Sequence, residues 1–179
     1  MKTLLVCSGL LLGATTLLAQ QAAPKAPPKS PPATAMATID GKSITITYSS
    51  PRVRGREGKI FTSDGLISHD PHYPVWRAGA NSATTLLTDG DLTIGDLTVP
   101  AGKYTLFVDI SNPEAWVLIV SKATGEWGLA YDATKDLGRT TMTMSKPDSM
   151  VEDLAWSIGQ KQITLEWENM KASVPVAVK

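Results

Sequence analysis

The chain of 179 residues contains a single cysteine, Cys7, which lies inside an apolar run at the amino terminus. We expect this run to be removed, so that the mature protein has no disulfide, catalytic thiolate or cysteine metal site. Net charge is also lacking, because 17 basic and 17 acidic side chains cancel. Without a global positive field, nucleic-acid binding is not expected.

The sequence also lacks the common signatures of enzymes. No serine lies in a Gly-x-Ser-x-Gly elbow, and there is no phosphate loop, His-Glu-x-x-His motif or dinucleotide fingerprint. Acidic side chains are paired at Glu152 and Asp153 and again at Glu166 and Glu168, and we interpret both pairs as surface charge. These absences favour a noncatalytic protein that needs no cofactor.

The amino terminus has the pattern of a secretory signal peptide over residues 1–19. Lys2 precedes the apolar run 4–18, and small residues follow at Ala19 and beyond. The run is shorter than the about 20 residues that a membrane-spanning helix needs, so no membrane span is expected after cleavage. We expect an exported protein, periplasmic or extracellular.

Residues 20–34 are rich in proline, which favours an extended polyproline II conformation. We interpret them as a disordered linker that precedes one folded domain over residues 35–179.

Beyond residue 35 the hydrophobic pattern repeats every two residues, as in strands with one buried face. Ile44, Ile46 and Tyr48 share one face of such a strand, and Asp40-Gly41 before it predicts a tight hairpin turn. No long segment has the periodicity of a helix. The sequence therefore predicts an all-β domain, a single antiparallel β-sandwich or jelly-roll-like domain of about nine or ten short strands.

Two strands, 103–110 and 115–121, are predicted to form a hairpin at the core of this domain. The second is apolar on both faces, as a central strand of a two-layer structure should be. The final strand, 172–178, contains Pro175, which cannot donate a ladder hydrogen bond, so we expect that strand at an edge or with a bulge.

Five segments resemble the DUF2911 family of exported bacterial proteins of unknown function. They are TYSSPRVRGREGKIF (47–61), YPVWRAGANSATT (73–85), VPAGKYTLF (99–107), EWGLAYDATKDLGR (126–139) and LEWENMKASVPV (165–176). The WRAGAN stretch, 76–81, is the most specific of these elements, whereas 61–73 is longer than in a typical member. The resemblance implies a β-rich exported protein and supplies no catalytic residues.

The WRAGAN stretch is the first candidate binding site. Trp76 offers an aromatic face, Arg77 a rigid fork of donors, and Asn81 an amide that donates and accepts, which together suit a sugar or a carboxylate. In the structural alternative, Trp76 fills the core, Gly79 adopts a positive φ, Asn81 caps a turn and Arg77 is tied to a buried carboxylate.

Four cations lie within eight residues just before this stretch, namely Arg52, Arg54, Arg56 and Lys59. Alternation would put the arginines on one side of an extended segment, where they could hold phosphate or an acidic polysaccharide. A solvated loop balanced by nearby acids is the alternative. Of the four, we include Lys59 in the candidate ligand site, since it and Arg77 flank the 61–73 segment. Trp127, which lies between two glycine-containing turns, is included as an exposed aromatic.

The sequence HDPH could bind a metal ion. His69, Asp70 and His72 offer two imidazoles and one carboxylate, a donor set that zinc accepts. The alternative is an ordinary solvated turn, because Asp70 precedes Pro71.

Three functions remain open. The first is a noncatalytic module that binds a small polar ligand or glycan; the second is a structural or interaction protein of the cell envelope, with no partner identified; the third is a hydrolase with its site in the loops 52–81. An open groove with an exposed tryptophan would favour the first, and a dry apolar patch the second. Arg77, Asn81 and a histidine in one concave pocket would favour the third.

Overall fold

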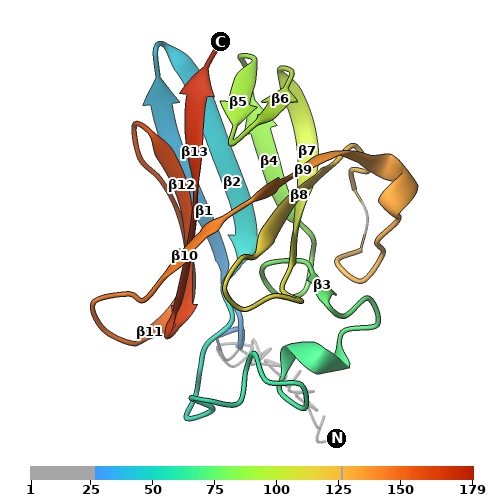
Figure 1. The fold of residues 1–179 in the computed structure, drawn as a ribbon, viewed down its shortest axis with the longest axis vertical. Coiled ribbons are helices and arrows are strands. Elements are labelled where there is room, and N and C mark those ends of the chain that lie inside the picture. The colour runs from blue at the N-terminus through green and yellow to red at the C-terminus, as the bar shows by residue number, and fades with distance from the viewer. Residues whose placement is uncertain (1–26, 126) are drawn as a thin grey trace, which may run out of the picture.

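Two antiparallel β-sheets pack face to face in the computed structural model, which describes residues 27–125 and 127–179 (Figure 1). This confirms the predicted β-sandwich and decides against a closed barrel. The predicted signal peptide, 1–19, and the first part of the predicted linker lie outside the described residues. Among the described residues, no helix has the length and apolar character needed to cross a bilayer.

The first sheet has the strand order β1-β2-β4-β7-β8-β9, with the short β3 beside β7. Its strands are β1 (Pro32–Ile39), β2 (Lys42–Ser49), β3 (Val75–Trp76), β4 (Thr84–Thr88), β7 (Gly102–Asp109), β8 (Val117–Ser121) and β9 (Asp136–Thr141).

The second sheet has the order β11-β12-β13-β5-β6, with β10 also paired to β13. Its strands are β5 (Leu92–Ile94), β6 (Leu97–Val99), β10 (Thr143–Ser145), β11 (Val151–Ile158), β12 (Gln162–Glu168) and β13 (Met170–Val178). Two short 3-10 helices, η1 (Ile67–His69) and η2 (Ala133–Lys135), complete the described elements.

The first hairpin confirms the turn predicted from Asp40-Gly41. Ile39 pairs with Lys42, so the turn has two residues, and both have positive φ, 48° at Asp40 and 78° at Gly41. This geometry matches the right-handed twist of the flanking strands. However, β1 begins at Pro32, so residues 32–34 belong to the sandwich and the predicted end of the linker is too late in the chain.

The predicted core hairpin is also confirmed, as β7 pairs with β8 in the interior of the first sheet. Residues 27–125 and 127–179 form thirteen strands rather than nine or ten. One of the extra strands is β3. Another arises because the predicted strand 139–145 is divided at Met142, which is 1% exposed and donates its N–H to the Trp116 carbonyl at 2.7 Å. The chain thereby passes from β9 in the first sheet to β10 in the second.

The expectation that the last strand lies at an edge or carries a bulge is wrong. β13 has neighbours on both sides, and its pairing with them has no register shift. Pro175 is tolerated because of where its nitrogen points. The Val176 N–H faces β12 and donates to Lys161 O, so the Pro175 nitrogen faces the opposite side. There β10 begins with Thr143 opposite Ser173, and β5 ends with Ile94 opposite Val176. The missing donor falls between two partner strands.

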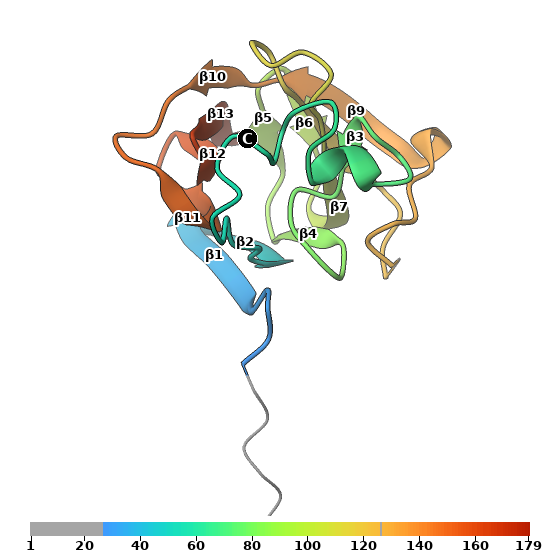
Figure 2. The ribbon, with the colours of Figure 1, turned by 90° about the horizontal axis from the view of Figure 1, so that it is seen from below.

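An aromatic cluster fills one end of the sandwich. Trp76 stacks on Trp167 with ring centres 5.9 Å apart, and Phe61 lies within 5.0–5.9 Å of the Trp76, Trp116 and Trp167 rings. The segment between β2 and β4 crosses this end of the molecule, as the view from below shows (Figure 2). The cluster therefore supports the loops that carry the WRAGAN stretch and the arginines.

Candidate functional site

The arginine-containing loop is fixed against the outer edge of β11 by backbone hydrogen bonds. Val53 N donates to Glu152 O at 2.8 Å, and Leu154 N donates to Pro51 O at 2.9 Å. The loop then winds tightly, with positive φ at Arg54, Gly55 and Gly58. The arginine side chains therefore extend from a backbone that hydrogen bonds hold in place, and not from a freely solvated loop.

The acidic pairs of the sequence take part in this anchoring. Glu152 and Asp153 are exposed, as predicted, but Glu152 Oε1 also accepts from Arg54 N at 2.9 Å and Asp153 pairs with the Arg52 guanidinium. Glu168 is not surface charge, because it is only 5% exposed and its carboxylate accepts from Gly58 N. Glu166 forms an ion pair with Lys171 at 3.0 Å.

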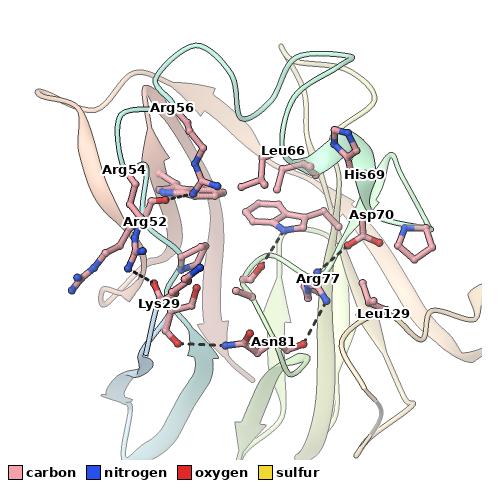
Figure 3. A pocket seen from close by; sticks show the side chains of 18 residues that line it. Lys29, Arg52, Arg54, Arg56, Leu66, His69, Asp70, Arg77, Asn81 and Leu129 are labelled. Atoms are coloured by element: carbon pink, nitrogen blue, oxygen red, sulfur yellow. Dashed lines mark hydrogen bonds and ion pairs between the residues drawn. The ribbon is translucent and has the colours of Figure 1, made fainter. Parts of the chain in front are cut away.

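A cleft of about 630 Å³ opens between this loop and the WRAGAN stretch. Four of the five arginines in the chain line it, namely Arg52, Arg54, Arg56 and Arg77. Lys29 adds a fifth cation, and Asp70 is the carboxylate among the lining residues. Figure 3 shows Arg52, Arg54 and Arg56 on one side and His69 and Asp70 on the other, with Leu66 between them. We call these two sides the arginine wall and the Asp70 wall.

On the arginine wall, part of each guanidinium is already hydrogen-bonded. Arg56 donates from Nε to Val53 O at 2.9 Å and from Nη2 to Arg52 O at 2.6 Å. Arg54 Nη2 donates to Lys29 O at 3.3 Å. Because a guanidinium carries five N–H donors, these bonds orient the arginines and leave further donors for a ligand.

On the Asp70 wall, an ion pair is buried without full hydrogen bonding. Arg77 Nη2 lies 3.5 Å from Asp70 Oδ2, and their side chains are 19% and 6% exposed. Arg77 Nε and Asp70 Oδ2 have no hydrogen-bond partner among the described residues. Burial lowers the pKa of the Arg77 guanidinium from its usual value, and the Asp70 charge opposes that shift. The wall thus contains one buried donor and one buried acceptor that lack a hydrogen-bond partner among the described residues.

His69 lines the same cleft in a defined tautomer. Its Nδ1 lies 2.8 Å from the Gly65 carbonyl oxygen, so Nδ1 must carry the proton that this contact requires. The neutral ring then has Nε2 as an acceptor.

Trp76 is part of the core beneath the cleft, as the structural alternative proposed. It is 1% exposed, and its Nε1 donates to Gly79 O at 3.2 Å. Trp167, also 1% exposed, lies beside it, and Leu66 and Ile67 contribute the aliphatic lining. The cleft therefore has a mainly apolar floor between two polar walls.

The expected positive φ at Gly79 is wrong, because Ala78 and Asn81 adopt that conformation instead, with φ of 50° and 57°. Position 79 requires a glycine for another reason. A Cβ at this position would lie 2.9 Å from Thr84 Oγ1 and 3.2 Å from Ser49 O. The left-handed Asn81 turns the chain at the rim of the cleft, where its Nδ2 donates to Ser30 O at 3.4 Å.

Three of the predicted site residues lie elsewhere. Lys59 is exposed but does not line the cleft. Trp127 is 62% exposed, as predicted, and pairs with Ser82 rather than facing the cleft. His72 lines a separate hollow with Lys122 and Tyr131.

The structure does not assemble the metal site considered for HDPH, since His69 and His72 line different hollows. Nowhere in residues 27–125 and 127–179 do three His, Cys, Asp or Glu side chains form a group that could hold a metal ion.

Lys29 and Ser30, which were not predicted as site residues, form part of the cleft rim. Both lie in the segment predicted as linker, and their carbonyls accept from Arg54 and Asn81. Proline-rich composition gave no signal of this docking. A signal did exist for the arginine wall, where arginine alternates with Val53 and Gly55.

Comparison with known proteins gives one family. The family DUF2911, described as a protein of unknown function, matches residues 30–176. No curated protein and no solved structure matches the chain.

Proposed function

For this chain, which belongs to the family DUF2911, we propose a noncatalytic function: binding of a small organic anion in the cleft between the arginine wall and the Asp70 wall. The pattern of residues 1–19 supports placing this activity outside the cytoplasm, in an exported domain. The observation that carries the proposal is the convergence of Arg52, Arg54, Arg56 and Arg77 on one cleft.

The convergence is not a consequence of general basicity. The chain has equal numbers of basic and acidic side chains, yet this cleft combines five cations with one carboxylate. Two of the five cations already have a carboxylate partner, Arg52 in Asp153 and Arg77 in Asp70. An anion in the cleft would offset the charge of the others. Arginine is also the residue best suited to paired hydrogen bonds with carboxylate or phosphate oxygens.

The dimensions of the cleft favour a small molecule. A volume of about 630 Å³ falls within the range of typical small-ligand sites, roughly 300–1,000 Å³. An apolar floor with polar groups at the sides is also the usual composition of such sites. A dry apolar patch, which would favour an interaction protein, is not what these residues form.

The proposal is tested by titrating the purified protein with inorganic phosphate, citrate and glucuronate by calorimetry. We expect at least one of these anions to bind, and Arg54→Ala to weaken that binding about tenfold, since it removes a charge-assisted hydrogen bond. Arg139→Ala is the matched control, because Arg139 is the fifth arginine and pairs with Asp136 outside the cleft. Equal losses in the two variants, or no binding of any anion, would contradict the proposal.

Hydrolysis is a second candidate, favoured by the presence of Arg77, Asn81 and His69 in one concave site. The acceptor at His69 Nε2 could take a proton from an attacking water. No hydrogen bond among the described residues joins His69 to a serine or threonine hydroxyl, so a serine nucleophile is not supported. Release of nitrophenol from nitrophenyl phosphate or a nitrophenyl ester, lost in His69→Ala, would establish this candidate in place of the first.

A further inference from the structure

We infer that the ligand is a polyhydroxylated anion, a molecule of monosaccharide size that carries a phosphate or carboxylate at one end and hydroxyl groups at the other. This inference rests on the proposed anion binding and adds the part of the ligand that faces the Asp70 wall.

The arginine wall fixes the position of the charged end. Arg56 is held by two backbone carbonyls and Arg52 by Asp153, so these guanidinium planes are oriented before a ligand arrives. Arg54 stands between them in sequence on a backbone anchored by Glu152. Oriented donors bind an anion without the full entropic cost of ordering long side chains.

The Asp70 wall is unsuited to a second anionic group. Asp70 is 94% buried as a side chain, given its 6% exposure, and Oδ2 has no hydrogen-bond partner among the described residues. A carboxylate accepts hydrogen bonds only, and it repels phosphate or carboxylate oxygens. A ligand group that satisfies this oxygen must donate a hydrogen bond.

The neighbouring groups on this wall require a ligand that can also accept. In the neutral ring, His69 Nε2 is an acceptor, because Nδ1 donates to Gly65 O. Arg77 Nε is a buried donor without a partner among the described residues. A hydroxyl both donates and accepts. A ligand with hydroxyls on adjacent carbons therefore complements the two acceptors, Asp70 Oδ2 and His69 Nε2, and the donor Arg77 Nε. An ammonium group or a second anion would complement only some of them.

The apolar floor lies between the two walls, so a ligand that contacts both walls must extend across it. Leu66 lies between the two walls in Figure 3. Trp76 and Trp167, each 1% exposed, are also among the lining residues. The C–H face of a sugar ring can cover such a floor while its substituents reach the walls. An inorganic phosphate bound at the arginine wall would leave the Asp70 wall unsatisfied.

The test compares four probes on the full protein by calorimetry: inorganic phosphate, glucose, glucose 6-phosphate and glucuronate. We expect glucose 6-phosphate or glucuronate to bind at least tenfold more tightly than both phosphate and glucose. The stronger of the two identifies whether the charged end is a phosphate or a carboxylate. If phosphate binds as tightly as both sugar anions, the inference is overturned while anion binding stands; if no anion binds, the proposed function itself fails.

Two variants test the Asp70 wall separately. Asp70→Asn should weaken binding of the preferred sugar anion at least fivefold, while phosphate binding stays equal or improves because a repelling charge is removed. His69→Phe, at an exposed position, removes the second acceptor and should also reduce the preference for the sugar anion over phosphate. Equal loss of both probes in both variants would show a purely structural role and overturn the inference.

Discussion

Among single residues, Trp76 contributes to the cleft chiefly by supporting its floor. The indole stacks on Trp167, contacts Phe61 edge-on and donates its N–H to Gly79 O. A side chain with these contacts stabilises the sandwich and the WRAGAN loop together. Trp127 shows the opposite environment, since it is 62% exposed.

These two tryptophans should therefore differ strongly in their contribution to stability. We expect Trp76→Ala to lower the free energy of unfolding by about 3–5 kcal/mol, the usual loss for a buried aromatic. Trp127→Ala should change it by less than about 0.5 kcal/mol. Urea denaturation of both variants measures the difference, and similar losses at the two positions would contradict the burial described.

Tyr131 provides a pH-dependent signal outside the cleft. Partial burial and its hydrogen bond to Asp136 Oδ2 at 3.0 Å raise the pKa of the phenol to about 12. The folded protein then keeps this proton at pH values where the unfolded chain, with a tyrosine pKa of about 10, loses it. Tyr131 therefore stabilises the fold below about pH 10, and this contribution is lost as the pH rises toward 12.

Absorbance of the phenolate during an alkaline titration tests this assignment. The native protein should contain a tyrosine that ionises near pH 12, and Tyr131→Phe should remove that step. Retention of the step in Tyr131→Phe would assign it to another tyrosine.

At the scale of elements, the sequence predicted those features that depend on contacts between residues close together in the chain. The Asp40-Gly41 turn and the core hairpin are set by adjacent residues, and both were predicted correctly. The division at Met142 depends on a carbonyl of the distant Trp116, and Pro175 is accommodated by a gap between two other strands. Neither arrangement leaves a signal in its own segment.

The first turn yields a prediction at this scale. Gly41 has φ of 78° with nothing within 4 Å of an added Cβ, so Gly41→Ala tests backbone strain without a clash. We expect a loss of roughly 1–2 kcal/mol, the cost of the left-handed conformation for an L-residue.

Gly159→Ala is the control for this turn, because its backbone is outside the left-handed region and its nearest contact would be an ordinary 3.7 Å. Its unfolding free energy, measured by urea denaturation alongside Gly41→Ala, should remain within about 0.5 kcal/mol of the parent protein. If Gly41→Ala were equally neutral, the hairpin turn would have to tolerate alanine by changing its conformation.

At the scale of the molecule, the two sheets share one hydrophobic core and the β9–β10 segment belongs to both. Leu165, 1% exposed in the second sheet, should therefore stabilise the first sheet as well. We expect Leu165→Ala to cost about 2–5 kcal/mol and to lower the hydrogen-exchange protection of β7 amides along with those of β12. Loss confined to the second sheet would show that the layers unfold independently.

The candidate site also illustrates what only the whole fold reveals. Arg77 and Asn81 were predicted as ligand contacts, and both line the cleft. Of the four cations at 52–59, Lys59 was predicted in the site, whereas Arg52, Arg54 and Arg56 are the ones that line it. Which cations meet depends on loop 51–60 being anchored along β11, about a hundred residues away in sequence. Lys29 joins the cleft through the same loop, because its carbonyl accepts from Arg54.

The two carbonyl contacts of residues 29 and 30 have a mechanical consequence. The chain enters the domain past Arg54 and Asn81 before it reaches the first pair of the β1–β2 ladder, Pro32 with Ser49. Tension applied at the amino end of the domain would load those contacts first and the ladder afterwards. Such a pull would thus reach the mouth of the cleft before it reaches the strands.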